Sequence, residues 1–202
     1  MGAVKEPPIF IGFSAATGLL GGMLGAAIRA FTGGTVNHAF LVYFDRHWGA
    51  WLTVGANANG LTIMTIPEFC KTRKIKFLFS TIGFSLWDGL RAHVGDLDRG
   101  YNYGGLIGMA NVEIVKKLRG RLGDNFLSQR GKLFCSQWDA EIIKAAMLNK
   151  PLVRPAPIPF LAGVRDDEVD PSALCTAIQA RPDAFKSEVV GQVFVPLMLA
   201  AA

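Results

Sequence analysis

Apolar and polar residues alternate along the first half of the chain, as they do in strands that bury one face. Residues 8–13 predict a buried strand, and the glycine-rich run that follows, 16–31, predicts a buried helix. A break at 32–34 ends that helix. Runs rich in branched and aromatic residues then predict four more strands, with a turn at 45–49 between the first two: 36–44, 50–56, 60–66 and 75–80.

The second half of the chain has a helical period instead. Ser85 stands where it can cap one helix, and Asp170 followed by Pro171 is a typical helix start. The proline-rich stretch 150–160 predicts an extended connection, and 191–199 predicts a last strand. The pattern therefore favours an α+β fold, an antiparallel β-meander packed against helices, in one domain over residues 1–202. The predicted helices are 85–94, 104–118, 136–148 and 170–178.

The composition is unusually apolar for a free monomer. Hydrophobic residues make up 50% of the 202 residues and charged residues 18%, and the mean hydropathy is +0.30. Such a chain is expected to bury surface in an assembly, a partner or a membrane. The segment 9–31 is long enough to span a bilayer. This segment contains five glycines and Arg29, and no basic flank precedes it. These features favour a buried segment over a membrane span, and no signal peptide is expected.

The chain is basic, with a net charge of +5 and a pI near 9.3. Its basic residues gather at 71–76 and 116–121, which fits either solvated faces or contact with an acidic polymer. No nucleic-acid-binding motif accompanies them, so nucleic acid is not an expected partner. The three cysteines, an odd number, favour a reducing compartment or a lone reactive thiol over a disulfide framework: Cys70, Cys135 and Cys175.

Cys135 precedes a predicted helix. A thiol is a strong nucleophile only as the thiolate, and a helix N-terminus or a nearby imidazolium lowers its pKa, to about 3.5–7.5 in known cases. Ser136 and Asp139 form an S-x-x-D start that resembles a capping box. These features predict an activated nucleophile, whereas a cysteine beside Phe134 can equally be a small core residue.

His38 lies within a predicted strand and is the histidine best placed to serve as a base. His47 falls in a polar turn, and His93 falls on a predicted helix. A strand histidine on an apolar face is either a packed core residue or a base held by a polar neighbour. The alternation places His38 on the face of Val36, Phe40 and Val42.

Hairpin register offers a polar neighbour for His38. A turn centred on His47 and Trp48 pairs His38 with Asn57, whereas a shift by one residue selects Gly55 or Asn59. An asparagine there would hold the imidazole as the third member of a Cys-His-Asn set.

The order of these features resembles the circularly permuted papain-like group of the NlpC superfamily, which includes YiiX/YebB-like proteins and lecithin retinol acyltransferases. The similarity covers roughly residues 8–180. "TVNHAFLVYF" is similar to the group's histidine strand, "NANGLTIMTIPEF" to its following hairpin and "GYNYGGLIG" to a tyrosine segment before the nucleophile. "LFCSQWDAEIIKAA" is similar to its nucleophile helix, and "VDPSALCTAI" to its closing helix.

The resemblance implies roles for individual residues. Cys135 would be the nucleophile and His38 the general base, with Asn57 as the third member. Tyr101, together with backbone amides at the start of the Cys135 helix, would stabilise the oxyanion.

The chain also departs from the group. Asn37 stands where the group often has serine, Gln137 stands where it often has glutamate, and Gly55 stands where many members carry the third catalytic glutamate. These differences leave the third role to Asn57, to Asn59 or to no residue.

The resemblance implies a cysteine peptidase or amidase that cleaves peptidoglycan peptides and needs neither a metal nor a cofactor. Similar domains occur in phage tail tips, which implies contact with other tail subunits and a location in the virion or the bacterial cytoplasm. Two alternatives keep the fold: a catalytically silent structural subunit of a tail or other assembly, and a lipid acyl hydrolase or acyltransferase docked on a membrane by residues 9–31.

Overall fold

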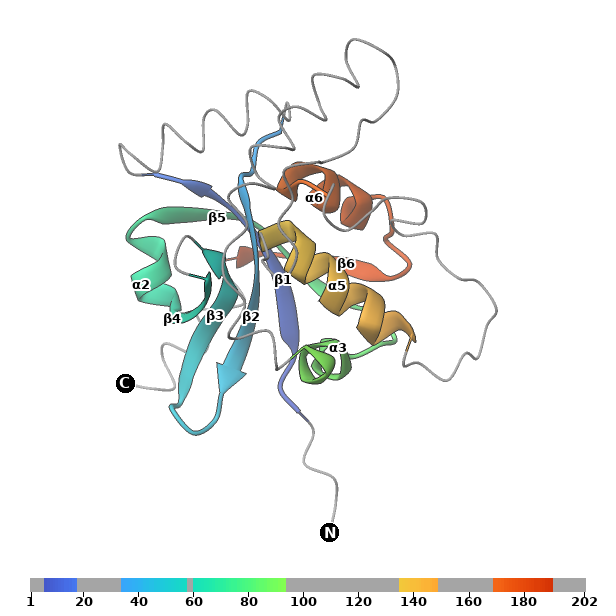
Figure 1. The fold of residues 1–202 in the computed structure, drawn as a ribbon, viewed down its shortest axis with the longest axis horizontal. Helices are drawn as coiled ribbons and strands as arrows, with labels where there is room; N and C mark the ends of the chain where they lie inside the picture. Colours follow the sequence, from blue (N-terminus) through green and yellow to red (C-terminus); the bar gives the residue numbers. More distant parts are fainter. Residues whose placement is uncertain (1–5, 18–33, 58–59, 94–134, 149–168, 191–202) are drawn as a thin grey trace.

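The protein has an α+β fold built on a six-stranded antiparallel sheet (Figure 1). The computed structural model describes residues 6–17, 34–57, 60–93, 135–148 and 169–190. The spatial order of the strands is β4-β3-β2-β1-β5-β6. The predicted α+β class and antiparallel sheet are therefore confirmed. The strands are β1 (Ile9–Ala16), β2 (His38–Asp45), β3 (Ala50–Asn57), β4 (Gly60–Thr65), β5 (Arg73–Thr81) and β6 (Phe185–Glu188).

Helices cover both faces of this sheet. Leu86, Trp138 and Leu174, from three different helices, belong to one apolar cluster on one face. Phe69, from a short helix, packs into a separate cluster on the other face. Figure 1 shows the three helices together on one side and the short helix α2 on the other. The helices are α2 (Ile66–Cys70), α3 (Leu86–Ala92), α5 (Cys135–Leu148) and α6 (Pro171–Gln179).

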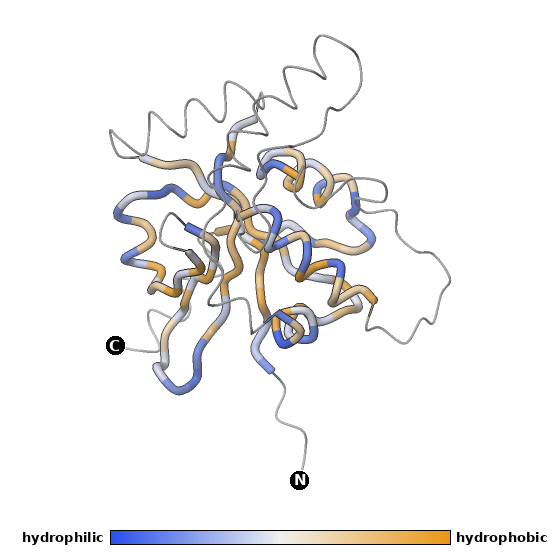
Figure 2. The backbone as a smooth tube through the Cα atoms, viewed as in Figure 1, coloured by the Kyte–Doolittle hydropathy of each residue, from blue (hydrophilic) through white to orange (hydrophobic). Residues whose placement is uncertain are grey.

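Strand alternation separates the two apolar clusters. In β2, Ala39 and Leu41 face the α5 side, whereas Phe40 and Val42 face the α2 side. Figure 2 shows the hydrophobic colour concentrated in the middle of the sheet and on parts of the helices beside it. Val36 belongs to the α5-side cluster and not to the face of Phe40, because it precedes the regular strand. The prediction that Val36 lies on the same face as His38 and Phe40 is therefore wrong.

The hairpin between β2 and β3 has the predicted turn. The Asp45 carboxylate accepts hydrogen bonds from the backbone amides of His47 and Trp48, at 2.8 and 3.0 Å. Gly49 takes a φ of 60°, which glycine adopts without strain. Leu41 pairs with Val54, which confirms the register centred on residues 47 and 48.

The first element differs from the prediction at its end. Strand β1 continues through residues 14–16, beyond the end of the predicted strand and into the first residue of the helix predicted over 16–31, because Ser14 pairs with His38 and Ala16 pairs with Arg73. Helix α2 and strand β6 are additions that the hydrophobic pattern did not indicate. The rest of the first predicted helix, 18–31, lies outside the described residues, as do the predicted segments 104–118, 150–160 and 191–199.

Two predicted helix caps are confirmed. The Ser85 hydroxyl accepts a hydrogen bond from the amide of Trp87 at 3.3 Å. The Asp170 carboxylate accepts hydrogen bonds from the amides of Ser172 and Ala173 at 2.7 and 2.9 Å. Each side chain thus satisfies amides that the first helical turn leaves unpaired.

Close packing of α3 on α5 depends on Gly89, and this gives a stability prediction. A Cβ at this position would lie 2.1 Å from the carbonyl oxygen of Ile142, so one of the two helices must move. We expect Gly89→Ala to lower the free energy of unfolding by about 1–3 kcal/mol, the usual cost of overpacking. Urea denaturation measures the loss.

Arg91→Ala is the control on the exposed side of the same helix. It removes only solvent-exposed ion pairs with Asp88 and Glu6, which are worth at most about 1 kcal/mol. Equal stability of Gly89→Ala and wild type would contradict the close helix contact.

Candidate active site

The residues with candidate chemistry gather at one end of the sheet. His38 begins β2, Asn57 ends β3 and Arg73 begins β5. Because these neighbouring strands run antiparallel, the start of one lies beside the end of the next. Ser14, near the end of β1, and Cys135, the first residue of α5, complete the group.

Cys135 is buried, with 4% of its surface exposed. Burial, followed by a contribution from the negative charge of Asp139, raises the pKa of its thiol to about 11. Hydrogen bonds from the amides of Ala39 and Ser136 and the positive charge of Arg73 act in the opposite direction. The predicted lowering of the pKa is therefore wrong for this structure, because desolvation outweighs the favourable field at the start of the helix.

The predicted capping box at the start of α5 is also wrong. Ser136 lies within the first helical turn and is fully buried, and its hydroxyl donates a hydrogen bond to the carbonyl of Val169. Asp139 is fully buried too, and neither of its carboxylate oxygens has a hydrogen-bond partner among the described residues. Burial raises the pKa of this carboxyl well above its ordinary value. Ser136 thus anchors α5 to the segment that precedes α6.

His38 is buried among aromatic rings on the α2 side of the sheet. Its ring stacks on Phe40, with centroids 5.9 Å apart, and lies 6.1 Å from the ring of Phe69. Burial, followed by the charge of Arg73, lowers the pKa of His38 well below its ordinary value. The imidazole is therefore uncharged at neutral pH, which is the form that can accept a proton. Within the described parts of the chain, its Nε2 atom has no hydrogen-bond partner.

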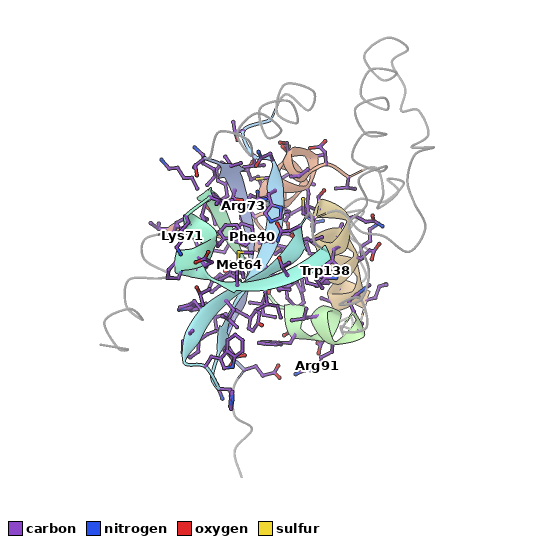
Figure 3. The ribbon with its side chains drawn as sticks, turned by 60° about the vertical axis from the view of Figure 1, so that its left-hand side comes forward. Phe40, Met64, Lys71, Arg73, Arg91 and Trp138 are labelled. Carbon is purple, nitrogen blue, oxygen red and sulfur yellow. The ribbon has the colours of Figure 1, made fainter. Side chains whose placement is uncertain are left out.

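The backbone of β2 connects His38 with Cys135. The Cys135 sulfur interacts with the amide of Ala39, the residue that follows His38. The side chains approach from different sides, since α5 packs on the Ala39 face and the imidazole lies on the Phe40 face. Figure 3 shows Phe40 and Arg73 on the opposite side of the sheet from Trp138 of α5. The structure thus brings both residues to the same strand end, with no hydrogen bond from Nε2 to the thiol.

Asn57 lies at the expected strand end but has other partners. Its side-chain amide donates hydrogen bonds to the carbonyl of Gly55, at 3.3 Å, and to the hydroxyl of Thr62. Its side-chain oxygen accepts a hydrogen bond of 3.5 Å from Arg73. Asn57 therefore orients Arg73 and not His38 in this structure. Tyr101 and Asn59, the other candidates, lie outside the described residues.

Packing explains why glycine occupies position 55. A Cβ on Gly55 would lie 3.1 Å from the Cβ of Phe40, which is tighter than ordinary contacts. Phe40 also covers Gly12 on β1, where a Cβ would lie 2.4 Å from its ring. A side chain at position 55 would thus press on the start of the Phe40 side chain and on the backbone of β2.

Asn37 and Gln137, the other departures from the family pattern, have structural partners. The Asn37 side-chain oxygen accepts a hydrogen bond from the Ala16 amide at 3.2 Å, which fixes the end of β1 against the start of β2. The Gln137 side-chain amide donates a hydrogen bond of 2.9 Å to Glu141, one turn further along α5. Asn37 thus helps to position His38, whereas Gln137 stabilises its own helix.

Sequence reasoning missed Arg73 and Ser14. Arg73 belongs to the basic run 71–76, which resembles a solvated face, yet its guanidinium lies 5.9 Å from the centroid of the Phe69 ring. Its charge affects the pKa values of both His38 and Cys135. Only the pairing of β5 with β1 brings Arg73 to this end of the sheet, and no local pattern announces that pairing.

Comparison of the chain with protein-family models, curated proteins and solved structures found no match. None of the helices in the described ranges is long and apolar enough to cross a membrane. The described residues also contain no group of three or more histidine, cysteine and acidic side chains that could hold a metal ion.

The raised pKa of Cys135 predicts how the three cysteines react with iodoacetamide. At pH 7 we expect Cys70, which is exposed, to be alkylated first in the folded protein. Labelling of Cys135 should accelerate only as the pH rises toward about 11, and that of Cys175 toward about 12. Peptide mapping after timed labelling measures the three rates. A Cys135 rate that reaches its plateau below pH 8 would show that the thiol is activated in the free protein.

The buried Asp139 predicts an unusual dependence of stability on pH. Its pKa is raised in the folded state, so the folded protein holds this proton at pH values where the unfolded chain has lost it. Its contribution to stability is greatest below the unfolded pKa, near 3.8, and declines as the pH rises toward the folded pKa. We expect Asp139→Asn to be more stable than wild type at pH 7 and equally stable at pH 3. Urea titrations at both values test this, with exposed Asp88→Asn as the control.

Proposed function

We propose that this protein is a cysteine hydrolase of amide bonds with a permuted papain-like fold, in which Cys135 is the nucleophile and His38 the general base. The observation that carries the proposal is that a thiol and an imidazole both lie at the same end of β2. A buried thiol at the start of α5 interacts with the amide of Ala39, and the preceding residue is an uncharged histidine. The sequence motifs around both residues support the same assignment.

The raised pKa of the thiol and the lowered pKa of the imidazole favour a neutral resting pair. In the resting structure the imidazole lies on the Phe40 face and the thiol on the α5 face, so the mechanism requires the His38 side chain to turn toward Cys135 at the strand end. His38 then takes the thiol proton while the Cys135 sulfur attacks the substrate carbonyl, and the oxygen of that carbonyl becomes negative. Collapse of this intermediate forms a thioester, and the departing amine receives the proton from His38. Water then attacks the thioester with His38 as base, which releases the acid and restores the thiol.

Three groups at the site would stabilise the negative charge that develops during attack. Amide donors at the start of α5 and at Ala39 favour negative charge on sulfur and on the substrate oxygen. The positive charge of Arg73 lowers the pKa of the thiol and acts in the same sense. Asn57 holds the guanidinium in place.

Peptidoglycan peptides are the proposed substrate, and a phage tail tip is the proposed setting. Wall peptides contain amide bonds next to free carboxylates, which suits a site with a nearby arginine. A tail assembly also suits the apolar side chains that the described surface exposes, such as Trp48 at 66% and Val189 at 60%. These residues would contact neighbouring tail subunits.

The exposed apolar residues also favour a second candidate, a structural assembly subunit without activity. The full burial of Asp139 beside the thiol, without a hydrogen-bond partner among the described residues, fits that candidate too. A membrane-docked lipid hydrolase is less well supported, because Ile9–Ala16 of the proposed docking segment form a central strand of the sheet.

Single substitutions distinguish these candidates. We expect Cys135→Ala to abolish release of soluble fragments from purified peptidoglycan and to leave the melting temperature nearly unchanged, because no other group can form the thioester. His38→Ala should lower the rate about 10²–10⁴-fold, the usual contribution of a general base. Cys175→Ala, at a second buried cysteine, should retain full activity.

A lipid ester serves as the parallel substrate. Equal release by wild type and Cys135→Ala on peptidoglycan would exclude Cys135 as the nucleophile. Turnover of the ester alone would point to a lipid hydrolase, and a folded wild type inactive on both substrates would favour the structural subunit.

A further inference from the structure

Two buried polar groups face each other across β1 and β2, and neither has a hydrogen-bond partner among the described residues. Ser14 pairs directly with His38 in the antiparallel ladder. Their exposed fractions are 0% and 3%. The Ser14 hydroxyl and the His38 Nε2 atom are both unpartnered.

The ladder places the two side chains on the same face of the sheet. Directly opposite residues have Cβ atoms about 4.5–5.5 Å apart, so a change in side-chain torsion brings a serine hydroxyl within reach of a histidine ring. A buried donor or acceptor that has no hydrogen-bond partner lowers the stability of the folded protein. One hydrogen bond between Ser14 and His38 would satisfy both groups.

The other side chains that the structure describes around His38 do not provide this bond. Phe40 and Phe69 present only carbon atoms to the imidazole. Asn57 is bonded to Thr62, Gly55 and Arg73. Arg73 can only donate hydrogen bonds, so it cannot accept one from a ring N–H.

The start of β2 is also held firmly against the end of β1. The Asn37 side chain accepts a hydrogen bond from the Ala16 amide, and the Asn37 amide donates one of 3.0 Å to the carbonyl of Ser14. These contacts flank the Ser14–His38 pair on both strands. They hold the backbones of the two residues opposite each other.

We propose that Ser14 is the positioning residue for His38, and that its hydroxyl accepts a hydrogen bond from the Nε2–H group. The Nδ1 atom then keeps its lone pair and is the nitrogen that accepts the proton. This assigns to Ser14 the role that Asn57 was expected to fill. The catalytic part of the inference rests on the proposed function, whereas the hydrogen bond itself does not.

The tautomer of His38 tests the hydrogen bond without any measurement of activity. Nitrogen NMR of protein labelled at histidine distinguishes Nε2–H from Nδ1–H, and the chain has only three histidines. A spectrum of His38→Gln assigns the signal. We expect wild type at pH 7.5 to hold His38 in the Nε2–H form. Ser14→Ala should shift the ring toward a mixture, and Ser14→Thr, which keeps a hydroxyl, should restore the wild-type form.

Ser80→Ala is the matched control, because Ser80 is a strand serine whose hydroxyl bonds to Glu188 instead. It should leave the His38 signal unchanged. An identical tautomer in folded Ser14→Ala and wild type would overturn the proposal. This comparison decides the matter even if Ser14→Thr fails to fold.

Kinetics provide the second readout. Ser14→Ala should lower kcat on the order of tenfold with KM unchanged, less than the about 10²–10⁴-fold expected for loss of the base itself. An unchanged kcat would overturn the positioning role. If the wild type hydrolyses nothing, the proposed function fails, and the tautomer comparison still determines whether Ser14 holds His38.

Discussion

The pairing of β1 with both β2 and β5 is the constraint on which the rest of the structure depends. One edge of β1 sets Ser14 against His38, and the other edge sets Ala16 against Arg73. Without this central strand, the histidine and the arginine would belong to separate parts of the molecule. The Asn37 side chain fixes the strand end where these pairs occur. The candidate site is therefore a product of sheet order more than of any single motif.

Packing around Phe40 determines what else fits on the α2 face. The ring lies over Gly12, where a Cβ would clash with it, and the Cβ of Phe40 leaves only a tight space for a Cβ at Gly55. Phe40 also contacts Phe69, with ring centroids 4.3 Å apart, and stacks on His38. The same aromatic contacts that hold the imidazole also remove water from it, which explains its lowered pKa. Position and protonation state of His38 thus have a common cause.

Burial also determines the protonation state of the Cys135 thiol. The start of a helix and two backbone amides favour a thiolate at Cys135, but desolvation and the buried Asp139 carboxyl outweigh them. A thiol of high pKa and an uncharged imidazole would suit the proposed catalysis, in which proton transfer accompanies attack. The proposed hydrogen bond from the His38 Nε2–H group to the Ser14 hydroxyl would fix the tautomer that such a transfer requires.

The sequence by itself determined the local features of the fold. Alternation located the central strands, the turn at 45–49 limited the hairpin register to a few neighbouring choices, and Ser85 and Asp170 identified two helix starts, since each signal depends only on neighbouring residues. It also placed Cys135 at the start of a helix.

Only the tertiary structure decided which of these elements meet and what surrounds them. The sequence predicts that β1 ends at residue 13 and that a helix begins at 16, but residues 14–16 extend the strand because β2 and β5 pair with them. The sequence pattern around Arg73 is typical of a solvated face, and only the pairing of β5 with β1 places this residue at the candidate site. The direction of the Cys135 pKa shift depends on burial by distant segments, and burial depends on packing across the whole sheet, which no local pattern of residues encodes.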